Sequence, residues 1–366
     1  MAGRRAPAPE AGDQVVELES IDDAARWDAL LAGVGFSPWQ QSRAYGAALA
    51  HAGRPVRRLR LAVRGETLGV VQAVGRLTAG GRVGLWHALG GPLWRPGVAT
   101  AAKVAALGAL ERELAGPWRR LVVTPALPPA RTAAALEAAG MRRVMTGYTT
   151  AVLPIAATAE RQTARLQPSW RRALRRSPEP PLPLSCRDAR ADPSGLDAAL
   201  ALHARERRRR GYAAVSRELV AAAARRGPAL LATADGAAGP AAFVLVFVHG
   251  ATATYEVGWT NAAGRAAHAH HRLLWTIVDR LRERGVRLLD LGGLDLPAGI
   301  VRFKLASGAL PRTYAGSYLA GAGLTAPARC PSRGSRASSR AGSSAERPAP
   351  PSAARRWSAC RAAPAG

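Results

Sequence analysis

AAFVLVFVHGATATYEVGWTNAAGRAAHAHHRLLWTIVDRLRERGVRLLDLGGLDLPAGIVRFKLASG, residues 241–308, is the stretch that decides the fold of this chain. It opens with two apolar, β-branched runs parted by His249 and Gly250, a pattern that predicts a β-hairpin. Apolar residues then recur every three or four positions from Leu273 to Leu281, which predicts a helix that ends at Gly285. The run 286–291 is typical of a buried strand. The predicted order is therefore strand, strand, helix, strand.

The residues that join the second predicted strand to the helix form a candidate anion site. This segment is TNAAGR, residues 260–265. Backbone amides at a helix start bind anions, and an arginine beside them adds positive charge. Gly264 and Arg265 are therefore candidate cofactor-binding residues, which would hold a pyrophosphate if the chain used an acyl-CoA.

Three short motifs follow the last predicted strand. They are LDLGGL (289–294), GIVRFK (299–304) and, after Gly308, YAGSY (314–318). In this order they resemble the FemAB-type aminoacyltransferases, which add amino acids to the peptide stem of peptidoglycan precursors and carry D-x-G-G, a glycine before F-K and a later Y-x-G-S-Y-like strand. The resemblance spans residues 39–319, thinly in the first half. Ser307 departs from it, because relatives commonly carry an aromatic residue there.

The resemblance implies the fold, an α/β chain with mixed sheets in two tandem GNAT-like (acyl-CoA N-acyltransferase-like) domains. The first half fits this expectation, because hairpin, glycine-containing loop, helix and strand recur there between residues 57 and 124. The expected domains are residues 13–155 and 156–320. A flexible leader, residues 1–12, and an Ala/Pro/Ser/Arg-rich tail, residues 321–366, flank them. The tail has too few large apolar residues to fold, so we expect it to be disordered.

Several elements are predicted between these two cores. The pattern favours one strand at 143–153, one basic helix at 159–176 and a stiff proline-rich connector at 178–183. Helices are expected at 197–210 and 216–225.

Composition points to a polyanionic partner. The chain has 366 residues and 48% hydrophobic content, which is enough for two ordinary cores. Its formal net charge is +27, of which the tail supplies +7 through eight arginines and one glutamate. The remaining +20 favours tRNA, a nucleotide-linked precursor or peripheral contact with an anionic membrane surface. A merely solvated arginine surface is the alternative.

The resemblance also implies an activity, transfer of an aminoacyl group from aminoacyl-tRNA to an amine of a peptidoglycan precursor (lipid II or UDP-MurNAc-pentapeptide). An ester donor is already activated, so the enzyme needs alignment and oxyanion stabilisation rather than a nucleophile. Lys304 matches a family lysine that stabilises developing charge, and Phe303 stands beside it. Lys304 and Lys103 are the only lysines in this arginine-rich chain, which indicates a need for a compact ammonium at position 304. The alternatives are a surface lysine and a core phenylalanine.

Two arginine-rich segments are candidate contacts to substrate. Arg209 and Tyr212 match a family T-x-x-R-x-G-F turn near the precursor, although Glu206 stands where the threonine is usual. The segment WRRALRR, residues 170–176, resembles the family's W-R-x-x-I-R-R. Phosphate or tRNA contact and a solvated arginine face both remain open for it.

Three further residues are predicted to contact substrate. Tyr255 matches a family tyrosine close to the precursor, and Asp290 is the acid of the D-x-G-G motif. Gln40 lies in SPWQQS (37–42), which resembles the family's S-P-x-Q-S segment. The structural alternatives are a packed strand aromatic for Tyr255 and a cap or strand-end contact for Asp290.

The cysteines and the histidine run carry no metal-binding pattern. They are Cys186, Cys330 and Cys360, and His268, His270 and His271. The histidines have no i, i+4 pair and no Asp, Glu or Cys beside them, so we expect neither a metal nor a bound cofactor. The cysteine usage fits a reducing compartment. Since residues 1–13 lack an apolar run and the uncharged stretch 236–255 is broken by glycine and proline, we expect a cytoplasmic protein.

Three functions therefore compete. The first is a FemAB-type aminoacyltransferase that acts in cell-wall bridge formation and hence in cell shape. The second is an acyl-CoA-dependent N-acyltransferase, although the 260–265 loop lacks the full Q/R-x-x-G-x-G/A signature. The third is a duplicated scaffold without enzymatic activity that binds RNA through its basic helices.

Overall fold

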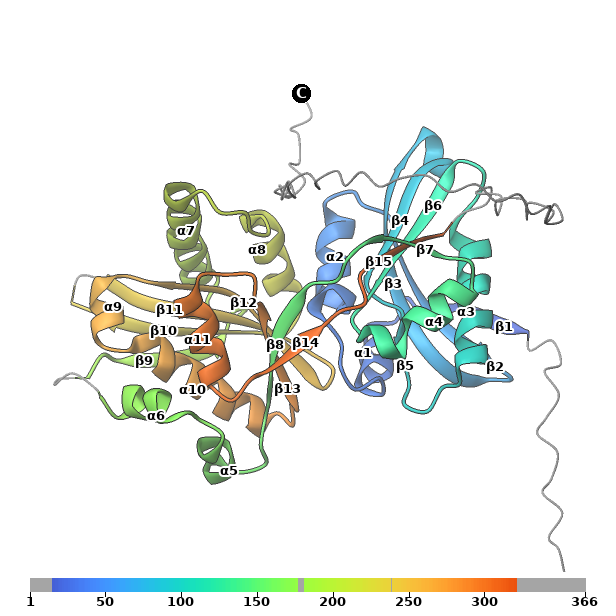
Figure 1. The fold of residues 1–366 in the computed structure, drawn as a ribbon. Helices are drawn as coiled ribbons and strands as arrows, with labels where there is room; N and C mark the ends of the chain where they lie inside the picture. Colours follow the sequence, from blue (N-terminus) through green and yellow to red (C-terminus); the bar gives the residue numbers. More distant parts are fainter. Residues whose placement is uncertain (1–14, 177–180, 238, 321–366) are drawn as a thin grey trace, which may run out of the picture.

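The computed structural model describes residues 15–176, 181–237 and 239–320. The predicted leader and tail lie outside these residues, as does part of the predicted connector. The described chain forms two lobes side by side, each a mixed β-sheet covered by helices (Figure 1). This confirms the α/β fold class with two GNAT-like units.

The elements of the first half are β1 (Val16–Ser20), α1 (Ala24–Ala32), a 3-10 turn (Trp39–Gln41), α2 (Arg43–His51), β2 (Val56–Val63), β3 (Glu66–Thr78), β4 (Val83–Gly90), β5 (Leu93–Trp94), α3 (Thr100–Leu114), β6 (Arg119–Pro125), α4 (Ala133–Ala138), β7 (Arg142–Met145) and β8 (Thr149–Pro154). The elements of the second half are α5 (Ala159–Ala164), α6 (Pro168–Arg175), β9 (Leu184–Asp188), α7 (Pro193–Arg210), α8 (Arg217–Arg226), β10 (Ala229–Gly236), β11 (Gly239–His249), β12 (Thr252–Thr260), α9 (Ala262–Ala266), α10 (Ala269–Glu283), β13 (Leu288–Gly293), α11 (Ala298–Ala306), β14 (Leu310–Thr313) and β15 (Ser317–Ala320).

Strand β11 is buried on both faces, which explains its continuous apolar sequence. Its even-numbered residues from Ala242 to Val246 pack in the core that contains α10. Its odd-numbered residues from Phe243 to Phe247 pack in the core that contains α7 and α8. The apolar stripe of α10 from Leu273 to Leu281 is fully buried against the sheet, as its spacing predicts.

The two sheets share one topology and exchange one strand each. The first sheet has the order β1-β2-β3-β4-β6-β15-β7, and the second has the order β9-β10-β11-β12-β13-β8-β14. Strand by strand the orders correspond, but the sixth place in each sheet is filled from the other half of the sequence. The expected boundary at residues 155 and 156 therefore separates β8 from the sheet to which it is hydrogen-bonded.

Two three-residue crossovers carry the exchanged strands between the lobes. One joins β7 to β8 through Gly147, and the other joins β14 to β15 through Gly316. They touch: a Cβ on Gly147 would overlap the carbonyl oxygen of Tyr314, and one on Gly316 would overlap that of Met145. The amide of Tyr314 also donates to the carbonyl of Tyr148 at 3.0 Å. Only glycine therefore allows the two crossovers to pass each other.

A second contact between the lobes comes from the SPWQQS segment. Trp39 stacks on Phe247 with ring centroids 4.7 Å apart, which places it in the core under α7 and α8. Gln41 is fully buried, donates to the carbonyls of Gln72 and Leu89, and accepts from the Gln72 amide. Gln41 is thus a structural residue, because every polar atom of its side chain is bound within the first lobe.

Two of the predicted elements are wrong, because each corresponds to two separate elements in the structure. The strand expected at 143–153 is β7 and β8, which belong to different sheets and are separated at Gly147. The helix expected at 159–176 is α5 and α6, because Pro168 begins a new helix at its first turn. Strand β9 lies just past the predicted connector and was not predicted. Within the described residues, no helix combines the length and the apolar content that a bilayer span needs.

The crossover glycines give a stability prediction. Gly147→Ala should lower the free energy of unfolding by about 1–3 kcal/mol, because the new methyl group meets backbone rather than a side chain that can move. The matched control is Gly108→Ala in α3, where a Cβ meets nothing closer than 3.6 Å and a helical alanine is favoured. Urea unfolding monitored by circular dichroism measures both. Equal stability of the two variants would contradict the crossover packing.

Candidate functional site

The candidate site lies where β12 and β13 separate. These parallel strands pair only from Thr252 to Thr254 against Leu288 to Asp290. Beyond this point β12 stays paired with β11, while β13 continues against β8. The side chains just past the last paired positions therefore surround the separation of two neighbouring strands.

Asp290 explains the D-x-G-G motif physically. Its Oδ1 accepts a hydrogen bond from the amide of Gly292, two residues further along the chain, at 2.8 Å. Aspartate side chains favour this kind of local turn. Gly292 has φ +78°, a left-handed conformation that costs other residues free energy. Oδ1 also accepts the hydroxyl proton of Thr150, which comes from the exchanged strand β8. Asp290 is 5% exposed, and this burial raises its pKa. The two hydrogen bonds and the positive charge of Lys304 lower the pKa and offset part of that effect.

Lys304 lies on α11 and reaches back to the same motif. Its Nζ donates to the carbonyl of Gly293 at 2.8 Å, and the side chain is buried at 7% exposure. Burial lowers the pKa of Lys304 to about 8, while the charge of Asp290 opposes the shift. The lysine is therefore not a surface residue, and its ammonium faces the end of β13 beside a buried carboxylate.

Glu256 occupies a β-bulge at the separation. Leu245 and Val246 of β11 pair with Val257 and Tyr255, so Glu256 has no partner across the ladder. Bulges re-aim side chains, often beside active sites. Burial raises the pKa of Glu256 to about 8, and the charge of Asp290 adds to the shift. Within the part of the chain that the structure describes, its carboxyl makes no hydrogen bond or ion pair.

Tyr255 and Phe303 both lie next to His270, at the start of α10. The hydroxyl of Tyr255 lies 3.2 Å from Nε2 of His270, and burial raises the pKa of Tyr255. The ring of Phe303 packs edge-on against His270 and His271, at 6.3 and 5.0 Å, and 5.9 Å from the ring of Trp170. Phe303 thus packs in an aromatic cluster with Trp170, His270 and His271.

Gln40 reaches the same region from the first lobe. It lines a small hollow of about 10 Å³, room for one water, together with Tyr148 and Tyr314 of the two crossovers. The two tyrosine rings lie 4.6 Å apart. Burial and the charge of Asp290 raise the pKa of Tyr314 well above its ordinary value. The crossovers therefore connect the first lobe to the Asp290 region.

Arg209 and Tyr212 lie farther out. Arg209 forms a two-pronged ion pair with Glu206, at 2.9 and 2.7 Å, and 68% of its side chain is exposed. Glu206, the residue that departs from the family motif, therefore holds the arginine at the surface. Tyr212 is 41% exposed and packs 5.9 Å from His203.

The 260–265 segment does not join this group. Asn261 accepts the Gly264 amide at 2.9 Å and so caps α9 itself. A Cβ on Gly264 would overlap the Ala241 carbonyl oxygen, so the glycine packs against β11. Arg265 donates to the Thr260 carbonyl at 3.1 Å. The amide and the guanidinium that a pyrophosphate would take thus both have partners in the chain.

A wider hollow lies away from the predicted residues. It measures about 590 Å³ and is shallow, and Pro154, Arg165, Gln167, Leu305, Gly308, Ala309 and Leu310 line it. None of the predicted site residues is among these. We base the site on the buried Asp290–Lys304 pair rather than on this hollow, because the hollow contains no acid or base other than an arginine. Within the described residues, no three His, Cys, Asp or Glu side chains gather as a metal site would need.

Comparison with known proteins agrees with the fold. Residues 164–304 match the family model of an acetyltransferase (GNAT) domain. The solved structure of FemX aligns with a TM-score of 0.68 at 15% identity, over 83% of this chain and 96% of FemX. The chain has the fold of FemX. A conserved protein of unknown function from Bacteroides thetaiotaomicron VPI-5482 aligns at 0.54 and 13%, over 83% and 99% of the two chains. No curated protein matches the sequence.

Two residues of the site were not predicted. Thr150 belongs to a strand that the sequence assigns to the other domain, so no local pattern connects it with Asp290. Glu256 stands next to the predicted Tyr255, but alternation along a regular strand places neighbours on opposite faces. The bulge interrupts this alternation at Glu256, and Gly258, two residues on, is the signal in the sequence that could have indicated it.

The Thr150–Asp290 bond gives a second prediction. Thr150→Val should lower the free energy of unfolding at neutral pH by about 1–3 kcal/mol, because the buried carboxylate loses a donor. Thr150→Ser keeps the hydroxyl donor and should therefore retain most of the parent's free energy of unfolding. The control is Thr149→Val, whose hydroxyl bonds the exposed Thr313 hydroxyl. If Thr150→Val unfolded at the same urea concentration as Thr149→Val, the exchanged strand would not support Asp290.

Proposed function

We propose that this chain is an acyltransferase that moves an aminoacyl group from aminoacyl-tRNA to an amine of a peptidoglycan precursor, lipid II or UDP-MurNAc-pentapeptide. The observation that carries the proposal is the buried ammonium of Lys304 beside Asp290, at the strand separation of a FemX-like tandem fold. Such a reaction takes place on the cytoplasmic side of the membrane and forms cell-wall bridges, and no bound cofactor is required.

Lys304 would stabilise the transition state. When the amine attacks the ester carbonyl, negative charge develops on the carbonyl oxygen. A buried positive donor stabilises such an oxyanion more strongly than water does, because the surrounding dielectric is low and the donor is already oriented. The Gly293 carbonyl and the Asp290 charge hold the ammonium in place before the donor arrives. Lysine suits this task because it is a compact point charge.

Glu256 would accept the proton that the amine must lose. The acceptor enters as an ammonium, and one proton has to leave before nitrogen can attack. Glu256 is a half-buried carboxyl without a hydrogen-bond partner among the described residues, and desolvation raises its pKa to about 8, which suits proton transfer near neutral pH. The C–N bond then forms, the C–O ester bond breaks, and the ribose oxygen of the tRNA leaves with a proton.

The second candidate is an acyl-CoA-dependent N-acyltransferase, which the GNAT-domain match favours. Against it stands the segment 260–265, where the Gly264 amide and Arg265 are bound within the chain. The aminoacyl-tRNA donor fits better, because it needs no pyrophosphate site there.

A donor exchange experiment tests the proposal. With purified precursor as acceptor, aminoacyl-tRNA should give a labelled product and acetyl-CoA should not. Lys304→Ala should lower kcat by about 100-fold or more, as loss of an oxyanion donor does. The matched control is Lys103→Ala on α3 of the first lobe, which should retain full activity. Transfer from acetyl-CoA alone would establish the second candidate, and transfer from neither donor would leave the non-enzymatic scaffold.

The buried charges predict a bell-shaped pH profile of kcat/KM. Activity should fall below pH 8 as Glu256 is protonated and above pH 8 as Lys304 loses its proton. Asp290→Asn removes a negative charge that raises the pKa of both groups, so both limbs should move to lower pH. The exposed Asp295→Asn should leave the profile unchanged. A profile that is flat from pH 6 to 10 would rule out these two roles.

A further inference from the structure

The structure distinguishes the arginine run of α7 from that of α6, which the sequence alone does not. On α7, Arg209 and Arg210 pair with Glu206, and Arg207 donates to the carbonyls of Ala214 and Val215. These guanidinium groups are occupied within the chain. Their positive charge is therefore partly neutralised, or used to hold the turn after α7.

The arginines of α6 form a continuous stripe instead. Arg171, Arg172 and Arg175 lie on one side of the helix and Arg176 follows at its C-terminal end, while Trp170 and Ala173 are buried on the other side. We call these four arginines the α6 stripe. Within the described residues, no acidic side chain lies within ion-pair distance of the stripe. Arg171 and Arg175 stand in an i, i+4 like-charge pair, which is unfavourable in a helix.

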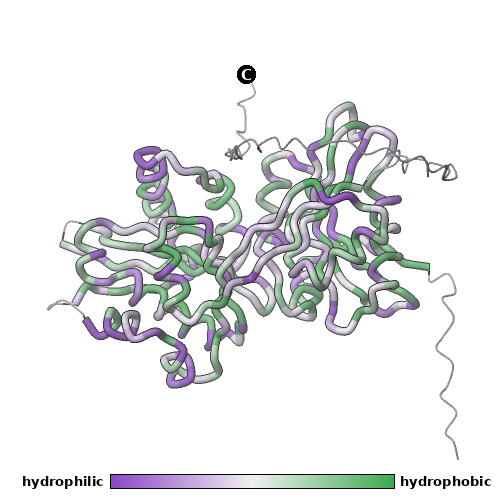
Figure 2. The backbone as a smooth tube through the Cα atoms, viewed as in Figure 1, coloured by the Kyte–Doolittle hydropathy of each residue, from purple (hydrophilic) through white to green (hydrophobic). Residues whose placement is uncertain are grey.

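Helix α6 packs directly on the helix that carries Lys304. The indole Nε1 of Trp170 donates to the carbonyl of Phe303 at 3.2 Å, and the Gln167 amide donates to the carbonyl of Ala306 at 3.0 Å. The α6 stripe therefore lies on the solvent side of a helix whose inner side contacts the residues flanking Lys304. Figure 2 places this hydrophilic segment at the outer edge of the second lobe.

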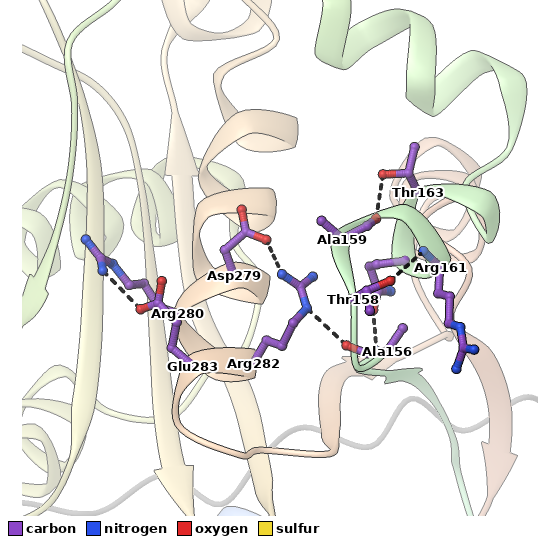
Figure 3. A network of polar contacts seen from close by, with 10 residues as sticks. Ala156, Thr158, Ala159, Arg161, Thr163, Asp279, Arg280, Arg282 and Glu283 are labelled. Carbon is purple, nitrogen blue, oxygen red and sulfur yellow. Dashed lines mark hydrogen bonds and ion pairs between the residues drawn. The ribbon is translucent and has the colours of Figure 1, made fainter.

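The segment before α6 is held firmly and adds further charge. Arg282 of α10 donates to Asp279 at 2.7 Å and to the carbonyl of Ala156 at 3.0 Å, which fixes the start of α5 (Figure 3). The guanidinium of Arg161 points away from this network. Arg161 and Arg165 are both exposed on this segment, with Glu160 as the one acidic neighbour in the first turn of α5.

We propose that the α6 stripe binds the phosphate backbone of RNA and is the surface on which the acceptor arm of the aminoacylated donor docks. This inference rests on the proposed function. RNA fits because a row of arginines that form no ion pair with the described residues can neutralise successive phosphates and release counterions. An anionic membrane fits less well, since a helix that lies in the interface inserts its apolar side, and here Trp170 and Ala173 are buried in the protein.

The test measures RNA binding without any transfer reaction. The probe is a fluorescent RNA hairpin with a single-stranded 3′ end that carries no amino acid, titrated with the full chain over a range of salt concentrations. In the stripe variant the four arginines become alanine. The control variant removes four exposed arginines of the first lobe that lack ion pairs, Arg82, Arg95, Arg112 and Arg142. Both variants lose the same net charge and retain the same arginine-rich tail.

The stripe variant should reduce the slope of log affinity against log salt by about 3 to 4, because each phosphate that is no longer neutralised lowers the slope by about 0.9. At low salt its affinity should fall by about tenfold or more, while the control should stay within about twofold of the parent. Replacing the four arginines by lysine should restore most of the affinity, because phosphate contacts need positive charge. Thermal melting checks that the variants are folded.

Three results would overturn the inference. Equal losses in the stripe and control variants would mean that only net charge matters. Unchanged RNA binding would exclude the stripe, and unchanged RNA binding with lost binding to phosphatidylglycerol vesicles would assign it to a membrane. The proposed function fails separately: a chain that binds RNA through the stripe but transfers no aminoacyl group would retain the RNA-binding surface and lose both the activity and the assignment of the RNA as its donor.

Discussion

The reciprocal exchange of one strand between the two sheets is the constraint on which the rest of the structure depends. The first half of the sequence builds seven strands in its own lobe and the second half builds six, and each half sends its last strand to the other lobe. The crossovers pass each other at Gly147 and Gly316, where no side chain fits. Because neither sheet is complete without the other half, the two lobes have to form together. The internal duplication thus produces one cooperative unit rather than two independent domains.

The exchange also completes the candidate site. Strand β8 brings Thr150 from the first half against Asp290 of the second. The crossovers bring Tyr148 and Tyr314 beside the same carboxylate, and Gln40 lies against both rings. A buried carboxylate is costly unless hydrogen bonds and opposite charge compensate it, and here Thr150, the Gly292 amide and Lys304 do so. The charges of the site are therefore maintained by residues from both halves of the sequence.

The low dielectric around this pair connects structure with chemistry. Burial makes the ionised forms of Lys304 and Glu256 less favourable, which moves the pKa of both to about 8 from opposite directions. Near that pH a fraction of the molecules carries both an ammonium and a carboxylate within one site. In the proposed reaction this combination would supply one group for the developing oxyanion and one for the proton of the amine.

Sequence patterns predicted the elements well and their pairing poorly. Periodicity identified β11, β12 and α10, because burial on one or both faces leaves a regular apolar pattern. The motif around Asp290 and the rarity of lysine singled out Lys304, which the structure buries beside that acid. The exchange of β8 was not predictable, since a strand's own residues do not specify which sheet it joins. The same limit applies to the bulge at Glu256 and to the ion pair that occupies Arg209.

Titration of Lys304 by nuclear magnetic resonance tests the central claim most directly, because the chain contains only two lysines. Nζ resonances of the ¹⁵N-lysine-labelled chain can be assigned with the Lys103→Ala variant. Lys304 should titrate with a pKa of about 8 and should shift when a non-hydrolysable aminoacyl-adenosine amide is added. A pKa near the ordinary lysine value of about 10.4, with no response to the ligand, would contradict a buried ammonium at the site of acyl transfer.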